Sequence, residues 1–398
     1  METAIQEIFE LDERVRLEAR NYPKKRESFE EIRRSRGKHF IGIVGPRGVG
    51  KTILLYQLRE MMDNSIYISL DAVPKMDLFE TVKVLFESYH ISLFFLDEIH
   101  FAADYKQHLK KIYDFLDVRI IFTSSVSLSL FDSAYDLSRR VRLFRLYPFS
   151  YREYLFFKRD LQIPKLTIED MMNKNWSAEH LKSGYLFDAY LKGGLFPFSL
   201  HEPDVFPLLD NIVKKIVQHD IPRLHSLFVE EISLVERMIQ FIGKAQVEGI
   251  NYSSLSRNLG ITKYKAEQYV DILEKAFILN AVRPKGANVS KEPKILMFLP
   301  FRLLYQEYED AVGGLREDFF AEMMVMNGIE FYYLKSTKGK KIPDFWVDLG
   351  GREIIIEIGG KGKGRTQFKG VDLEKSVIFS HQTEVIGDRR PLFLLGFL

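Results

Sequence analysis

The segment HFIGIVGPRGVGKTILLYQL, residues 39–58, carries the strongest structural signal in this chain. Apolar residues at Phe40–Val44 predict a short buried strand, and the run that begins at Ile53 predicts a helix. Between them, GPRGVGKT fits the pattern of a phosphate-binding loop, Gly45-x4-Gly50-Lys51-Thr52. That loop requires a strand before it and a helix after it. The segment therefore predicts a P-loop α/β fold with a parallel sheet.

The residue types in this loop suit the binding of a nucleotide triphosphate. Glycines let backbone N–H groups turn toward phosphate oxygens at a helix N-terminus, where the helix dipole favours anions. We expect Lys51 to reach the β- and γ-phosphates and the Thr52 hydroxyl to ligate Mg²⁺. The predicted cofactors are therefore ATP and Mg²⁺. The predicted nucleotide-binding residues are Gly45, Pro46, Arg47, Gly48, Val49, Gly50, Lys51, Thr52 and Ile53.

A second motif, SLFFLDEIH at residues 92–100, is an apolar strand that ends in two adjacent carboxylates. An ATPase needs one carboxylate to hold Mg²⁺ and another to activate the attacking water. We predict that Asp97 holds the metal and that Glu98 is the base. For His100 we expect only packing or surface polarity.

Two more strands complete the expected parallel set. SIYISL at residues 65–70 is one of them, and RIIFTSS at residues 119–125 is the other. The second strand brings Thr123 and Ser124 to the same edge of the sheet. Two alternatives are open: one of these hydroxyls senses the γ-phosphate, or the hydroxyls at the strand end only cap a turn.

These motifs resemble AAA-type P-loop ATPases. More narrowly, they resemble a prokaryotic, largely archaeal, family with a winged helix and a C-terminal restriction-endonuclease-like domain of unknown function. The resemblance rests on GPRGVGKT, FLDEIH, the TSS strand end, LSRRVRLFRLYPFSYREYL (137–155) and YLKGGLFPF (190–198). Ser124 stands where the family usually has a glycine, and Arg139-Arg140 stands where it has Gly-Arg. By resemblance, Arg140 is the candidate arginine finger, in cis or from a neighbouring subunit of a homo-oligomer. The alternative is a surface arginine that pairs with an acid.

The resemblance divides the chain into four domains. We expect an AAA-like core with N-terminal helices at 1–155, a helical lid at 156–228, a winged helix at 229–305 and a restriction-endonuclease-like α/β domain at 306–398.

The stretch NYSSLSRNLGITKYKAEQYVDILEKAFIL, residues 251–279, has the pattern of a helix-turn-helix. A short helix, a turn at Gly260 and a longer helix are followed by FILNAVR and KILMFL, which can pair as a wing. Residues 251–300 hold eight basic and four acidic residues, a net charge of +4, which favours duplex DNA as a partner. Protein contacts are the alternative. The candidate DNA-binding residues are Lys263, Tyr264, Lys265, Gln268, Lys285 and Lys291.

In the last segment, three carboxylates match the family's nuclease-like pattern: Glu317, Asp344 and Glu357. The resemblance implies that they converge on Mg²⁺. A nuclease of this kind usually carries a lysine two residues after the second carboxylate, but Gly359 stands there and Lys361 follows. We therefore predict a degenerate site that does not cut DNA.

Composition limits the class of protein. The chain has 398 residues, 46% hydrophobic and 28% charged, with a net charge of +2, as in soluble globular proteins. No apolar run is long enough for a membrane span. The absence of cysteine excludes disulfides and thiolate metal sites, and favours the cytoplasm.

The functional prediction is an ATPase that couples nucleotide state to DNA through the winged helix. One alternative is an ATP-bound regulatory or defence switch with little turnover, and another is an ATP-gated nuclease.

Overall fold

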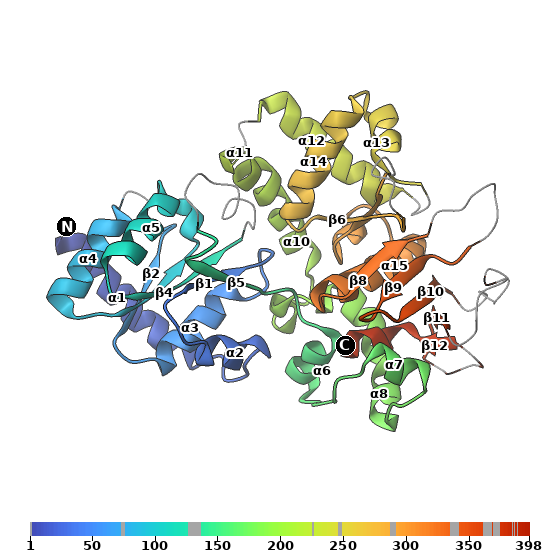
Figure 1. Cartoon of the computed structure of the whole chain (residues 1–398), viewed down its shortest axis with the longest axis horizontal. Coiled ribbons are helices and arrows are strands. Elements are labelled where there is room, and N and C mark those ends of the chain that lie inside the picture. The colour runs from blue at the N-terminus through green and yellow to red at the C-terminus, as the bar shows by residue number, and fades with distance from the viewer. Residues whose placement is uncertain are drawn as a thin grey trace. The chain divides into compact units, whose positions relative to one another are not determined.

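The computed structural model describes residues 2–72, 76–125, 137–224, 227–245, 249–286, 292–334, 342–360, 368, 375–383, 385, 387 and 389–398. Two compact units make up the chain, Met1–Pro148 and Phe149–Leu398 (Figure 1). The predicted lid, winged helix and end domain all fall in the second unit, and their division into separate domains stays a prediction.

A five-stranded sheet forms the centre of the first unit, with the order β2-β3-β4-β1-β5 and every pair parallel. Its strands are β1 (Phe40–Val44), β2 (Ser65–Ser69), β3 (Leu93–Asp97), β4 (Arg119–Ser124) and β5 (Val141–Arg145). This result confirms the predicted parallel P-loop sheet. Because β4 lies between β1 and β3, the carboxyl ends of these three strands meet at one edge, where all the ATPase motifs gather.

The helices of the first unit cover the sheet (Figure 1). They are α1 (Glu2–Ala19), α2 (Ser28–Arg34), α3 (Lys51–Met61), α4 (Leu78–Tyr89), the short η1 (Ile99–Phe101) and α5 (Tyr105–Phe115). Helix α1 protects the edge strand β2, because Asp12 accepts the N–H of Tyr67 at 2.7 Å. The same carboxylate pairs with Arg59 through two bonds of 2.6 and 2.7 Å. The edge N–H is thereby satisfied, so β2 does not offer it to another chain.

The second unit begins with short helical elements. They are α6 (Tyr151–Arg159), α7 (Ile168–Met172), α8 (Ala178–Ser183), η2 (Gly184–Leu186), α9 (Phe187–Ala189), η3 (Tyr190–Gly194), η4 (Pro197–Leu200), α10 (Phe206–Lys215), η5 (Ile216–Asp220) and α11 (Ile221–Leu224). Tyr151 of α6 packs in an aromatic cluster with Phe187 and with Phe393 and Phe397 near the end of the chain. The beginning and the end of this unit therefore share one core.

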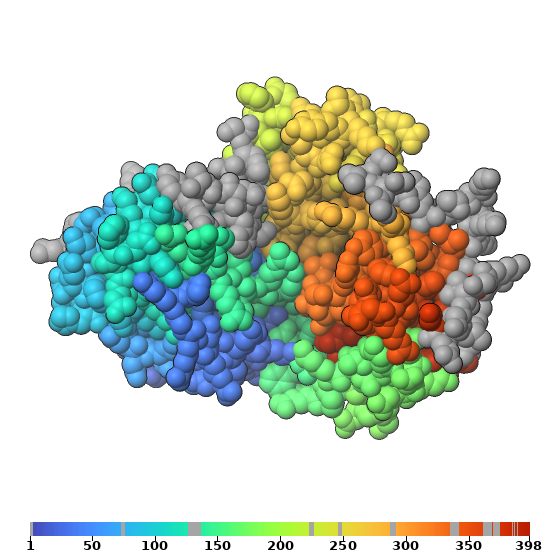
Figure 2. All heavy atoms as spheres, viewed as in Figure 1, coloured from blue at the N-terminus to red at the C-terminus, as the bar shows by residue number. Residues whose placement is uncertain are grey.

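The two helices and the strand pair that the sequence predicts between residues 251 and 300 are present. They are α12 (Val229–Lys244), α13 (Tyr252–Leu259), α14 (Lys263–Lys275), β6 (Leu279–Val282) and β7 (Lys294–Met297), with β6 and β7 antiparallel. Gly260 ends α13 with a φ of 66°. Ala266, Val270 and Leu273 are fully buried on one face of α14. Figure 2 shows this segment, coloured yellow, on the surface of the unit.

A second sheet, in the order β12-β11-β10-β9-β8, forms the end of the chain. The strands of this sheet are β8 (Glu330–Tyr333), β9 (Phe345–Asp348), β10 (Glu353–Gly359), β11 (Ser376–Ser380) and β12 (Arg389–Pro391). The helices of the same part of the chain are η6 (Phe301–Leu304), α15 (Tyr308–Met326) and η9 (Leu392–Phe397). Strands β8, β9 and β10 are antiparallel neighbours, whereas β10, β11 and β12 are parallel. Within the described ranges, no helix is long and apolar enough to cross a membrane.

Candidate nucleotide site

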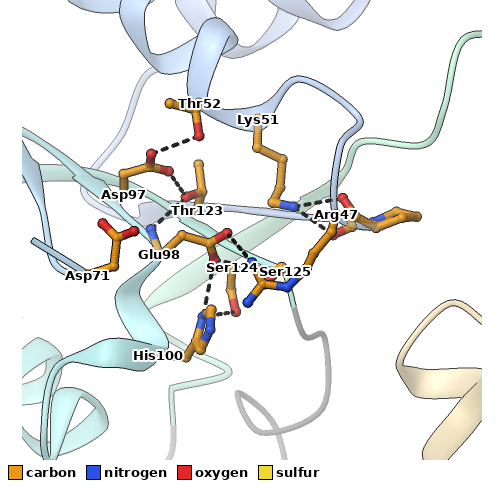
Figure 3. Close-up of polar contacts among 12 residues, drawn as sticks. Arg47, Lys51, Thr52, Asp71, Asp97, Glu98, His100, Thr123, Ser124 and Ser125 are labelled. Carbon is orange, nitrogen blue, oxygen red and sulfur yellow. Dashed lines mark hydrogen bonds and ion pairs between the residues drawn. The ribbon is translucent and has the colours of Figure 1, made fainter. Parts of the chain in front are cut away.

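The phosphate-binding loop connects β1 to α3 in the conformation that the glycines allow. A side chain at Gly45 would place its Cβ 1.9 Å from the carbonyl oxygen of Leu146, so only glycine fits there. Gly50 has a φ of 89°, which a residue with a side chain rarely adopts. The ammonium of Lys51 lies inside the loop and donates to the carbonyl oxygens of Gly45 and Pro46, both at 2.8 Å (Figure 3). The loop therefore has the shape and the cation for an anionic ligand.

Asp97, at the end of β3, is buried and holds three hydroxyl groups around its carboxylate. The hydroxyls of Thr52 and Tyr67 donate to one oxygen at 2.8 and 2.9 Å, and Thr123 donates to the other. Burial raises the pKa of Asp97, and the charge of Glu98 adds to this, while the hydroxyl donors act in the opposite direction. The predicted metal ligands Thr52 and Asp97 are therefore in direct contact.

Glu98 adopts a left-handed backbone conformation, with a φ of 52°. Its carboxylate accepts the N–H of Ser125 at 3.1 Å and lies 3.3 Å from His100 Nδ1 and 3.7 Å from an Arg47 nitrogen. Burial alone would raise the pKa of Glu98, but Lys51, His100, Arg47 and the Ser125 N–H together hold it below its usual range. A base with a low pKa is ionised near neutral pH, which is the state that accepts a proton.

Thr123 and Ser124 end β4 beside these carboxylates. The Thr123 hydroxyl accepts the N–H of Glu98 at 2.9 Å while it donates to Asp97, so it links the two acidic residues. The Ser124 hydroxyl lies 3.3 Å from His100 Nδ1. Both hydroxyls therefore contact side chains or backbone of the site itself.

Arg140 lies far from the loop of its own chain. Its carbonyl accepts the N–H of Phe40 at the beginning of β1, whereas the P-loop follows the end of that strand. Its guanidinium pairs with Asp114 through bonds of 3.0 and 3.1 Å. A role for Arg140 as an arginine finger in cis does not fit this position, because the length of β1 separates Arg140 from the P-loop. The observed pair with Asp114 matches the alternative given above, in which Arg140 is a surface arginine that pairs with an acidic residue.

The structure adds contacts that the sequence did not reveal. Tyr67 donates to Asp97, although it lies in an ordinary apolar strand and carries no motif. His100 is 6% exposed and contacts Glu98, so it does more than pack. The sequence signal for this contact is the position of His100 two residues after Glu98, because the tight turn of η1 brings the His100 side chain back to the site.

The candidate DNA-binding side chains of the second unit lie mostly in ion pairs. Each described lysine of this set contacts a carboxylate: Lys263 with Glu292 at 2.5 Å, Lys265 with Glu231 at 2.9 Å and Lys285 with Glu353 at 3.2 Å. Tyr264 is 69% exposed, and its hydroxyl accepts a hydrogen bond from Gln268 at 3.0 Å. Lys291 lies outside the described residues.

The nuclease-like carboxylates do not form the metal centre that the resemblance implies. Among the residues with described structure, no group of three or more acidic or histidine side chains is arranged to hold a metal ion. Glu357 is fully buried in β10, and the Glu317 side chain is only 15% exposed, so neither is a solvated surface charge. Asp344 precedes β9 and accepts the N–H of Ile358 at 2.8 Å. Lys361 lies outside the described residues.

Comparisons with known proteins agree with the architecture of the first unit. Residues 37–155 match the family model of an AAA domain, and residues 185–298 match a domain of unknown function (DUF8612). The uncharacterized protein MJ1637 of Methanocaldococcus jannaschii is 27% identical over 405 residues, which covers 91% of this chain and 85% of that protein.

Solved structures give weaker likenesses. The RuvB Holliday junction branch migration motor of Thermotoga maritima aligns at 16% identity and a TM-score of 0.28, over 68% of this chain and 89% of that one. PCH-2 of C. elegans aligns at 16% identity and a TM-score of 0.24, over 65% and 67%. Similarity of this size carries no argument about function.

None of these comparisons identifies a winged helix or a restriction-endonuclease-like fold, so both stay predictions. The matched family model and the geometry of the loop agree on the first unit. Residues 37–155 match the family model of an AAA domain and contain the parallel sheet and phosphate-binding loop of an AAA-like P-loop core.

Proposed function

We propose that this chain binds Mg-ATP at the P-loop, hydrolyses it, and couples its nucleotide state to duplex DNA through α13, α14, β6 and β7. One observation carries the proposal. The loop lysine, the paired Thr52 and Asp97, and the ionised Glu98 all lie at one edge of the parallel sheet (Figure 3).

The residues of the site fit ATP and Mg²⁺. Backbone N–H groups of the loop and the Lys51 ammonium would hold the phosphates, and Thr52 with Asp97 would hold the metal. When bound, Mg²⁺ supplies positive charge that offsets the charge on the phosphates. Glu98 then accepts a proton from water, and the Thr123 hydroxyl holds the Asp97 carboxylate and the backbone N–H of Glu98.

Arg140 has a place in this proposal only as a residue of a neighbouring subunit. Its ion pair with Asp114 would have to open before the guanidinium reached another chain's nucleotide. A homo-oligomer and a cytoplasmic location belong to the same proposal.

DNA binding by α14 requires an exchange of partners. Because Glu292, Glu231 and Glu353 compensate the lysines, a phosphate must replace each carboxylate. Such an exchange gains less free energy than the pairing of an unpaired lysine. The exposed Tyr264 and this charge compensation favour a second candidate, in which the same face contacts a protein.

The test of the coupling is steady-state ATP hydrolysis with and without duplex and single-stranded DNA. Stimulation by duplex DNA supports the proposal. Tight, slowly exchanging nucleotide with little turnover would favour the regulatory switch instead.

Charge variants separate DNA contact from protein contact. Neutralising Glu231 and Glu292 to Gln frees Lys265 and Lys263, so the affinity for DNA should rise. The slope of log K against log salt should steepen by about −0.9 for each phosphate that the freed lysines neutralise. Equal affinity and slope in both proteins would support the protein contact.

We further propose that the end domain does not cut DNA, because Gly359 provides no side chain where the usual lysine stands. The order of β8 to β12 and the buried acidic residues support descent from a nuclease. Plasmid that stays intact with Mg²⁺ or Mn²⁺, with or without ATP, is the expected result. Metal-dependent nicking that Asp344→Ala and Glu357→Ala both abolish would support the ATP-gated nuclease.

A further inference from the structure

A cation of the phosphate-binding loop contacts the candidate base. Arg47, the third residue of the loop, extends its side chain toward Glu98, and a guanidinium nitrogen lies 3.7 Å from Glu98 Oε1 (Figure 3). The two side chains are 12% and 16% exposed, so bulk water screens this pair less than it screens a surface ion pair. The side chain of Arg47 therefore spans the distance between the loop and the end of β3.

The two carboxylate oxygens of Glu98 have different partners. Oε2 accepts the N–H of Ser125 at 3.1 Å and lies 3.3 Å from His100 Nδ1, whereas Arg47 faces Oε1. The backbone N–H of Glu98 is in turn bonded to the Thr123 hydroxyl at 2.9 Å. Glu98 therefore stays held through Oε2 and through its backbone when Arg47 moves to another partner.

The hydroxyl of Ser125 indicates that a further polar group belongs beside Glu98. Ser125 is 2% exposed, and within the part of the chain that the structure describes its Oγ atom has no hydrogen-bond partner. A buried hydroxyl without a partner is unfavourable, and an oxygen atom of a phosphate or of an attacking water would remove that cost. The surroundings of Glu98 are therefore suited to an oxygen-bearing group.

The contacts of the loop and of the base define where the γ-phosphate lies. The Lys51 ammonium is inside the loop, where it would reach the β- and γ-phosphates, and the base has to face the water that attacks the γ-phosphorus. The γ-phosphate therefore lies between Lys51 and Glu98, and Arg47 extends from one of these sides to the other. Arg140 cannot serve there within its own chain, because it pairs with Asp114 at the other edge of the sheet.

We propose that Arg47 offsets the charge of the γ-phosphate within its own chain and so has the role of an arginine finger. On ATP binding its guanidinium exchanges the Glu98 carboxylate for γ-phosphate oxygens, which an arginine can bind through two parallel hydrogen bonds. Glu98 then accepts the proton of a water whose oxygen bonds to the γ-phosphorus, while the bond to the bridging oxygen breaks and its electron pair leaves with ADP. Arg47 therefore keeps the base paired until ATP arrives, a role that rests on the proposed hydrolysis of ATP.

Calorimetry separates a contact with the γ-phosphate from a contact with the base. The experiment uses the full chain with Glu98→Gln, which keeps ATP bound and prevents turnover during the titration. Adding Arg47→Ala to this protein should weaken Mg-ATP binding by about tenfold and leave Mg-ADP binding unchanged, because ADP lacks the γ-phosphate. An arginine that only holds Glu98 would change neither affinity, and one that only shapes the loop would change both. Either result would overturn the proposal.

Hydrolysis rates give the second readout. Arg47→Ala alone should slow steady-state hydrolysis by at least about 100-fold, and Arg47→Lys should recover part of the loss, since it keeps the charge without the paired hydrogen bonds. Arg142→Ala is the matched control, because the Arg142 side chain is 58% exposed, pairs with Glu31 and should leave the rate unchanged. A wild-type rate in Arg47→Ala would contradict the role of the arginine.

Mixing two impaired proteins tests whether the arginine acts within its own chain. Arg47→Ala keeps the nucleotide site without the arginine, and Lys51→Ala keeps the arginine with weakened nucleotide binding. The mixture should gain no activity, whereas recovered hydrolysis would show that Arg47 acts on a neighbouring chain. Failure of the two proposals is distinguishable. A wild type that does not hydrolyse ATP refutes the proposed function, whereas normal hydrolysis by both the wild type and Arg47→Ala refutes only the role of Arg47.

Discussion

Thr123 allows a sharp test of how Asp97 and the backbone of Glu98 are held in the candidate nucleotide site. Its hydroxyl donates to Asp97 and accepts the N–H of Glu98 at 2.9 Å, and the residue is fully buried. Thr123→Val removes the hydroxyl and keeps nearly the same shape. Thr123→Ser is the control, because it keeps the hydroxyl and loses one methyl group.

The expected losses follow from these two bonds. A hydrogen bond to a buried carboxylate is worth about 1.5–3 kcal/mol, and an unsatisfied buried N–H costs about 1–3 kcal/mol. Thr123→Val should therefore destabilise the first unit by about 3–5 kcal/mol, against about 1 kcal/mol for Thr123→Ser. Loss of the shared hydroxyl also frees the Asp97 carboxylate and the backbone of Glu98, so hydrolysis should slow by about 10–100-fold.

Stability is measured by urea unfolding, in the unfolding transition that moves to higher urea when ATP is added. The rate is measured by steady-state ATP hydrolysis, and the affinities by calorimetry with ATP and ADP. ATP and ADP affinities should change equally in Thr123→Val. Wild-type stability and rate in this variant would show that the Thr123 hydroxyl does not hold the site. A loss of affinity for ATP alone would mean that Thr123 senses the γ-phosphate.

Three further predictions concern single side chains. Glu98→Gln should keep ATP bound but slow hydrolysis by about 10²–10⁴ in a steady-state assay, and a normal rate would place the base elsewhere. Burial raises the pKa of Glu322 to about 8, so the folded chain holds a proton that the unfolded chain releases near pH 4.5. Stability to urea should therefore fall as the pH rises between these values, by up to about 1.4 kcal/mol per pH unit, and Glu322→Gln should remove that slope; an unchanged slope would contradict it. Arg140→Ala should leave ATP affinity of the single chain unchanged by calorimetry, because Arg140 pairs with Asp114 at the other edge of the sheet, and a large loss would contradict that placement.

The sequence was sufficient for the parts of the site that local order determines. Asp97 and Glu98 follow a strand, and the loop between β1 and α3 is continuous in sequence, so spacing alone placed their side chains. The position of Arg140 could also be predicted from the sequence. It precedes β5 whereas the loop follows β1, and in a parallel sheet these lie at opposite edges.

Contacts between elements that lie far apart in the sequence could not be predicted from sequence patterns. Tyr67 contacts Asp97 because β2 is the neighbour of β3, and the strand order of a sheet is a property of the whole unit. Lys294 reaches Glu317 because α15 packs along β7. Such a pair depends on packing across the unit, and neither residue carries a motif that names the other.

Binding of ATP at the P-loop is best measured by calorimetry of Mg-ATP with the wild type and with Lys51→Ala. In the structure the Lys51 ammonium donates to two loop carbonyls, and phosphate oxygens would replace them as acceptors. Charge-assisted bonds are worth about 1.5–3 kcal/mol each, so the variant should bind ATP at least about tenfold more weakly. The wild type should bind ATP, and the variant should show that loss. Equal affinity in both proteins, or no binding by the wild type, would contradict it.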